Sequence, residues 1–198
     1  LRQNLPKTPT LVGIDHGFSF PISYFRRYGL KSWDEFLVDF QKHWPTDRNH
    51  MYVDFCRDKG NPRTGRSNEF RLTEKRISSA KSVFQFKGQG TMAKATHAGI
   101  PWILFLRKEL GGKVHFWPFD GFAIPEGKSA MVEIHPSLVR KRYPVPAGFT
   151  EDERDAYGAA RWLQEIDRQE QLSRYLLPHL TDEEQLTVFL EGRILGVD

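Results

Sequence analysis

The sequence predicts a layered α/β domain, in which a sheet carries helices on its faces. Strand-like apolar runs lie at 11–15, 113–119 and 129–136, and glycine or proline residues bound the last two. Amphipathic helical patterns lie between and after these runs. The chain of 198 residues is long enough for one such core, and it has no internal repeat of the kind that builds solenoids. We therefore expect one domain over residues 1–198.

Capping boxes mark the starts of three predicted helices. In this motif a serine or threonine is followed three residues later by a glutamate, and both side chains bond to free backbone N–H groups. The three pairs are Ser32 with Glu35, Thr150 with Glu153, and Thr181 with Glu184. The first helix should end before Pro45. Another helix should end at Gly111 and be interrupted near Pro101, because proline lacks a backbone N–H.

A polar, basic segment at about 45–82 is predicted to be a long loop inserted into the domain, with a short helix near Thr73. Between Arg57 and Lys94, ten lysines and arginines face three acidic residues, which gives a net charge of +7. Such an uneven distribution favours an anionic partner such as nucleic acid, and a solvated loop explains it equally well.

Three acidic residues occupy positions where a carboxylate needs a partner. Asp15 ends the first strand, and Glu133 alternates with apolar residues on a probable inner strand. Asp155 lies on the helical stripe of Ala159 and Trp162, which should face the core. Burying a bare carboxylate costs several kcal/mol. Each acid alone is explained by capping, pairing or solvation, whereas the three together favour a cation site.

Mg²⁺ or Mn²⁺ would suit such a trio, since hard divalent cations prefer carboxylate oxygens. Two such ions about 4 Å apart can activate a water molecule and stabilise the leaving oxygen in phosphodiester hydrolysis. The trio therefore predicts a metal site with nuclease chemistry, with Asp15, Glu133 and Asp155 as metal ligands and catalytic residues.

Four short motifs carry a family resemblance. A strand ending in Gly-Ile-Asp, then "WPFDG", "VEIHPS" and "DERDAYGAARWL", resembles the domain-of-unknown-function family 429, predicted nucleases of the ribonuclease-H-like superfamily. The resemblance covers about a third of the chain. It implies a mixed sheet with helices on both faces. It assigns Asp15 to the first-strand acid, Glu133 to the Glu-x-x-Pro motif and Asp155 to the Asp-Ala helix. The chain departs from the superfamily where a helix and the basic segment replace an antiparallel hairpin.

Basic and histidine side chains near these motifs are candidate partners of phosphate. The candidate nucleic-acid contacts are Arg71, Lys75, Arg76, Arg140, Lys141 and Arg142. His16 and His135 lie next to, or two residues from, a candidate acid, and we consider them accessory groups for phosphate contact or proton transfer. Hydrogen bonding at a strand end is the simpler role for both histidines.

The expected function is thus metal-dependent phosphodiester hydrolysis, and two alternatives remain open. The first alternative is a non-catalytic module that binds nucleic acid or protein on the same fold. The second is a nucleotide-binding enzyme that uses the "GQGTMA" turn, Gly88 to Ala93, which fits the pattern G-x-G-x-x-A. The motifs do not distinguish DNA from RNA, single from double strands, endonuclease from exonuclease action, or one oligomeric state from another.

Composition favours a cytoplasmic protein without a membrane partner. No apolar run approaches the roughly 20 residues that span a bilayer, and the first ten residues lack the apolar centre of a secretory signal. The single cysteine, Cys56, rules out an intramolecular disulfide framework and agrees with a reducing compartment.

Overall fold

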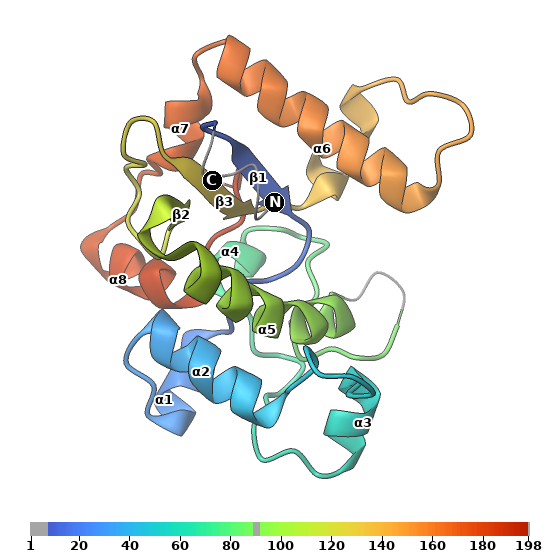
Figure 1. Cartoon of the computed structure of the whole chain (residues 1–198), viewed down its shortest axis with the longest axis vertical. Helices are drawn as coiled ribbons and strands as arrows, with labels where there is room; N and C mark the ends of the chain where they lie inside the picture. The colour runs from blue at the N-terminus through green and yellow to red at the C-terminus, as the bar shows by residue number, and fades with distance from the viewer. Residues whose placement is uncertain (1–7, 89–91, 198) are drawn as a thin grey trace.

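A three-stranded parallel sheet lies at the centre of the chain (Figure 1). The computed structural model describes residues 8–88 and 92–197. Its strands are β1 (Leu11–Ile14), β2 (Val114–Phe116) and β3 (Ser129–Glu133), in the order β1-β3-β2. All three predicted strands are confirmed. The described sheet has only parallel pairs, so the antiparallel part of the expected mixed sheet is not found in these residues.

An aromatic core fills one face of the sheet, beneath α1 (Ile22–Tyr28), α2 (Trp33–His43) and α5 (Ala93–Leu110). Phe20 lies at its centre, with ring centroids 4.8 to 5.3 Å from those of Tyr24, Phe36, Phe40, Phe84 and His97. Such offset and edge-to-face contacts add to the free energy gained from burying apolar area.

A smaller core fills the opposite face. Val132 and Ile134 turn toward α6 (Glu151–Arg168) and α7 (Leu172–Leu176), because successive residues of β3 face opposite sides. Figure 1 shows α6 on one side of the sheet and α5 on the other. Helices therefore cover both faces of the sheet, as expected.

The segment at 45–82 is more ordered than the sequence predicts. It contains two short helices, α3 (Val53–Asp58) and α4 (Leu72–Lys75), where we expected one. Cys56 and Thr73 are buried, so both helices are anchored to the rest of the domain. Helix α4 packs against α8 (Asp182–Glu191), and α8 also contacts α1.

Local signals predicted the helix starts but not the behaviour at Pro101. Ser32, Thr150 and Thr181 each accept a hydrogen bond from the backbone N–H of the glutamate three residues later. Helix α5, in contrast, runs through Pro101 without a break. Burial of its apolar face outweighs the missing hydrogen bond.

Short 3-10 turns complete the described chain at Gly111–Lys113, Pro136–Leu138 and Arg140–Arg142. The last two connect β3 to α6 and so lie beside the carboxyl end of the central strand. Within residues 8–88 and 92–197, no helix has both the length and the apolar character needed to cross a membrane.

Candidate functional site

The three predicted acids meet at the carboxyl edge of the sheet. Asp15 follows β1 and Glu133 ends β3, and these neighbouring strands pair Ile14 with Glu133. Helix α6 packs against β1 and carries Asp155 in its second turn. Partial burial, then the charge of Asp155 and then that of Glu133 raise the pKa of Asp15 from 3.8 to about 6. The three carboxyl groups are therefore close enough to repel one another, although they lie far apart in the sequence.

Glu133 forms a buried ion pair with Arg71. Two guanidinium nitrogens donate to its two carboxylate oxygens at 2.6 and 2.7 Å, and the N–H of Phe18 donates at 3.3 Å. The remaining Nε of Arg71 donates to Glu74 at 2.8 Å. Burial lowers the pKa of Arg71, but Glu133 and Glu74 outweigh it and hold the pKa above its ordinary value. One cation thus pairs with two buried acids.

Asp155 forms a bidentate ion pair of the same kind with Arg140. Nε and Nη2 of Arg140 donate to the two oxygens of Asp155 at 2.6 and 2.7 Å. Arg140 also pairs with Glu151 at 3.3 Å, and its side chain is 41% exposed. The hydrogen bonds to Asp155 raise the pKa of Arg140. This ion pair is therefore more exposed to water than that of Glu133.

These ion pairs leave Asp15 as the acid of the trio without an arginine in direct contact among the described residues. Its side chain is exposed at the end of β1, and the charge of Arg140 lowers its pKa only in part. A carboxyl group that titrates near pH 6 carries a proton part of the time near neutrality. Such a group suits proton transfer better than an ordinary aspartate.

The arrangement does not fit a metal ion as it stands. The donor chemistry is suitable, because carboxylate oxygens are the preferred ligands of Mg²⁺ and Mn²⁺. However, the oxygens of Glu133 and Asp155 accept hydrogen bonds from arginines. In the described part of the chain, no three His, Cys, Asp or Glu side chains lie close enough together to hold a metal. A metal needs at least one of these ion pairs to open.

The expected cationic ridge of Arg71, Lys75 and Arg76 does not form. Arg71 is 2% exposed and its guanidinium binds Glu133 and Glu74, so the predicted contact with nucleic acid would require these ion pairs to open. The tertiary pairing with Glu133 overrides the local helical pattern. Lys75 is exposed, while Arg76 pairs with Glu184 at 2.6 Å.

The other predicted contacts lie nearer the carboxyl edge. Arg140 forms an ion pair with Asp155, whereas Lys141 and Arg142 in the same 3-10 turn are exposed. These two cations flank the acid cluster and remain candidates for phosphate contact.

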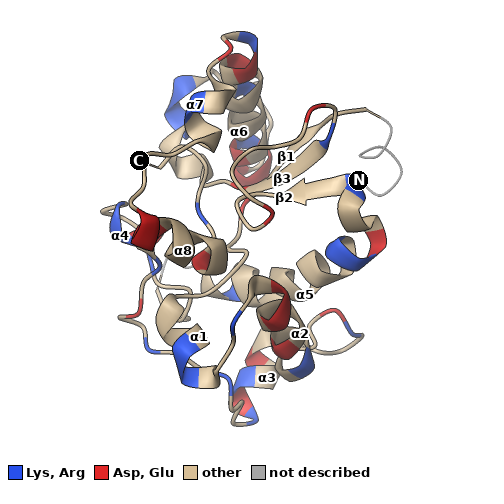
Figure 2. Cartoon of the chain, turned by 90° about the vertical axis from the view of Figure 1, so that its left-hand side faces the viewer, with Lys and Arg blue, Asp and Glu red and all other residues tan. Residues whose placement is uncertain are grey.

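Neighbouring acids neutralise part of the basic segment. Arg63 binds Asp39 through two bonds of 2.7 Å, and Lys94 pairs with Asp54 at 2.6 Å. Figure 2 shows acidic and basic positions interspersed over α2 and α3 rather than gathered on one face. The positive charge that stands out in the sequence is therefore weaker in space.

Both candidate histidines lie near the acids in their neutral form. Burial lowers the pKa of His16, whose Nδ1 lies 3.0 Å from the carbonyl oxygen of Gly17. Its ring packs against Gly99 so closely that an added Cβ there would lie 2.2 Å from Nε2. Burial also lowers the pKa of the half-buried His135, against the opposing charges of Glu133 and Asp155. At pH 7 neither ring carries a full positive charge.

Sequence analysis missed the residues that organise this edge from a distance. Glu191, at the end of α8, accepts hydrogen bonds from the backbone N–H groups of Ile22 and Leu72. It thereby ties α1 and α4 to α8. The spacing of Arg71 and Glu74 was a local signal for their pairing, but nothing local indicated Glu133 as the second partner. The turn at Gly88–Ala93 lies partly outside the described residues, which resume at Met92.

Comparisons with known proteins give no match: no family fits the chain, and neither a curated protein nor a solved structure is significantly similar. The resemblance to predicted nucleases therefore rests on the motifs alone.

Replacing Asp15 with Asn should stabilise the protein at pH 8 and leave it unchanged at pH 4. The folded-state pKa is about 6 and the ordinary value is 3.8, so the folded state loses stability as pH rises between these values. Asn cannot ionise and avoids that loss. We expect a gain of about 1 kcal/mol at pH 8, because water screens an exposed group. Urea unfolding at both pH values measures it, and a less stable variant at pH 8 would show that Asp15 gains more from Arg140 than it loses by repulsion.

Proposed function

We propose that the protein is a nuclease-like phosphodiester hydrolase whose reaction takes place at the carboxyl edge of the sheet. The observation that carries this proposal is the placement of three acids at one edge: Asp15 follows β1, Glu133 ends the neighbouring β3, and Asp155 lies on α6, which packs against β1. Ligands of open parallel sheets commonly bind outside the carboxyl ends of the strands. The resemblance of the four motifs to predicted nucleases supports the same chemistry.

In this proposal Asp15 acts as the general base. Above about pH 6 its carboxylate is ionised and can accept a proton from the water molecule that attacks phosphorus. The P–O bond to the leaving part of the strand breaks, and the leaving oxygen takes a proton from solvent. The ion pairs of Glu133 and Asp155 hold these acids in place and limit the local negative charge. The exposed Lys141 and Arg142 supply positive charge for the phosphate backbone.

We expect the proposed hydrolysis to require Mg²⁺ or Mn²⁺. Arg71 and Arg140 hold positive charge where a metal would otherwise do so, and the ion pair of Arg140 and Asp155 is the more exposed. Asp155 would be free to hold such an ion only if that pair were open.

A hydrolysis assay tests the function directly. Labelled single-stranded and double-stranded DNA and RNA are incubated at low salt with Mg²⁺, with Mn²⁺ or with a chelator. We expect cleavage of at least one substrate with a divalent ion and loss of cleavage with the chelator. Cleavage that survives chelation would contradict the metal requirement, and no cleavage under any condition would contradict the hydrolase.

The alternative is a binding module without catalysis, and the two arginine–carboxylate pairs favour it specifically. A fold that neutralises its acids internally needs no metal to keep them together. For this alternative we expect strand binding that weakens steeply with salt, because neutralised phosphates release counterions. Binding without cleavage, unchanged in the Asp15→Asn variant, would identify the module.

A further inference from the structure

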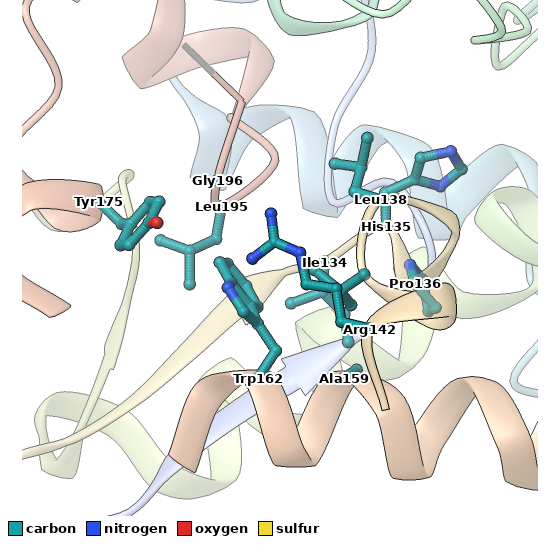
Figure 3. A pocket seen from close by; sticks show the side chains of 11 residues that line it. Ile134, His135, Pro136, Leu138, Arg142, Ala159, Trp162, Tyr175, Leu195 and Gly196 are labelled. Atoms are coloured by element: carbon teal, nitrogen blue, oxygen red, sulfur yellow. The ribbon is translucent and has the colours of Figure 1, made fainter. Parts of the chain in front are cut away.

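A pocket of ≈ 200 Å³ opens between the carboxyl end of β3 and α6 (Figure 3). Its walls are continuous with the acid cluster. Ile134 and His135 directly follow Glu133, and Ala159 lies one helical turn after Asp155. The pocket is therefore within reach of a substrate that lies over the carboxyl edge.

Most of the residues that line the pocket are apolar and two are aromatic, while polar atoms make up more than half of its accessible surface. Ile134, Val139 and Leu195 are buried and line it, together with Trp162 and Tyr175. The two aromatic rings meet edge to face, with centroids 5.4 Å apart and planes at 77°. Gly196 allows this arrangement, because an added Cβ there would lie 2.8 Å from the ring of Trp162. Trp162 is thus held rigidly against the cavity.

Three polar groups at the pocket have no hydrogen-bond or ion-pair partner among the described side chains. The indole Nε1 of Trp162 is buried without an acceptor, although the side chain is only 5% exposed. A buried tryptophan N–H usually has an acceptor. Arg142 and His135 also line the pocket, and Figure 3 shows the imidazole of His135 turned away from Trp162. Figure 3 shows Trp162, Leu195 and Arg142 turned toward one another.

We propose that this pocket holds a single nucleobase, with the phosphate of the same nucleotide at Arg142. A pocket that is lined by apolar side chains and also presents a few polar groups is typical of a small-molecule site. A base supplies a flat apolar face for the aromatic wall, and base stacking on aromatic residues tolerates any sequence. The volume is below the roughly 300 Å³ of pockets for larger ligands, so one base fits and two do not.

This inference deepens the proposed function, on which it rests for its substrate class. A strand with one base in the pocket would place an adjacent phosphodiester near Asp155, because Ala159 of the pocket lies one turn after Asp155 on α6. Asp15 follows β1, against which α6 packs. The base would have to leave its stack, so single-stranded substrates should be preferred.

Nucleotide binding to the parent protein and to two charge variants provides the first test. The probes are adenosine monophosphate, ribose 5-phosphate and inorganic phosphate, measured by isothermal titration calorimetry. We expect the nucleotide to bind and the two base-free probes to bind at least tenfold more weakly. Arg142→Gln should weaken nucleotide binding about tenfold, since it removes a charge-assisted hydrogen bond. Arg168→Gln is the matched control, because Arg168 is exposed in the last turn of α6 and does not line the pocket.

The indole N–H resonance of Trp162 provides a second readout. The chain has five tryptophans, and the Trp162→Phe variant assigns the resonance while keeping an aromatic ring in the wall. We expect nucleotide to shift this resonance and to leave those of the other four largely unchanged. An unshifted Trp162 resonance, equal binding of phosphate alone, or equal losses in both charge variants would overturn the base pocket.

Binding and hydrolysis together distinguish a failure of the base pocket from a failure of the proposed hydrolase. The shift of the Trp162 resonance also gives the affinity of each ligand. Tighter binding of a short single-stranded oligonucleotide than of the mononucleotide would assign the pocket to a strand. Tighter binding of the mononucleotide would assign it to a free nucleotide. Nucleotide binding without hydrolysis would support the proposed base pocket and contradict the proposed nuclease function. Hydrolysis without any shift of the Trp162 resonance would support the nuclease function and contradict the base pocket.

Discussion

Replacement of Arg71 with Met is expected to lower the free energy of unfolding by about 3–5 kcal/mol, because it leaves buried carboxylates without their cation. Arg71 is 2% exposed, and Glu74 and Glu133 are each 4% exposed. Both acids accept hydrogen bonds from its guanidinium. The midpoint of urea unfolding at pH 7 measures the effect.

Arg76→Met is the matched control for this prediction. Arg76 pairs with Glu184 at 2.6 Å on the surface, so its loss should cost under about 1 kcal/mol. If Arg71→Met is too unstable to purify, the triple variant with Glu74→Gln and Glu133→Gln should recover part of the stability, since it removes the stranded charges as well. Equal small losses for Arg71→Met and Arg76→Met would show that the buried pairs contribute little.

Loss of the Asp15 carboxylate should have the largest effect on the proposed hydrolysis. General-base catalysis contributes about 10²- to 10⁴-fold, so Asp15→Asn should lower kcat/KM by a factor in that range. In the parent, kcat/KM should fall as pH drops below about 6, because the base must be ionised. Asp155→Asn should shift this acidic fall of kcat/KM, the acidic limb of the pH profile, to lower pH. The substitution removes a charge that repels Asp15 and releases Arg140.

Asp167→Asn is the control for these activity measurements, because Asp167 is exposed on the same helix, α6, as Asp155. It should leave both the rate and the pH limb unchanged. A parent enzyme with no limb near pH 6, or an Asp15→Asn variant with full activity, would remove Asp15 from the catalytic role.

Local chemistry made much of the fold predictable. The strands carry short apolar runs, and the helices at Ser32, Thr150 and Thr181 begin with capping residues whose partners lie three positions away. Asp15 and Glu133 were identifiable as acids at or near strand ends, and parallel pairing then places them at one edge. Each of these inferences needs only neighbours in the sequence and the geometry of a regular element.

The partners of the acids were not predictable in the same way. Arg71 and Glu133 are separated by 62 residues, and an arginine in a basic segment gives no sign of which carboxylate it meets. Net charge counts cations without their partners, so the segment from Arg57 to Lys94 suggested a stronger positive surface than the structure has. Pro101 failed as a helix breaker because tertiary burial outweighs one lost hydrogen bond.

The position of Arg71 in the chain also bears on how the protein is synthesised. Most of the aromatic core comes from residues 18–116 and can collapse early, as these residues leave the ribosome. Helix α4 has only four residues and cannot persist alone, and its anchors at Glu133 and Glu191 are translated much later. During elongation Arg71 therefore stays hydrated. In the nascent domain the part of the inserted segment around α4 would stay unattached until translation delivers the central strand and α8, and only then can Arg71 bind Glu133.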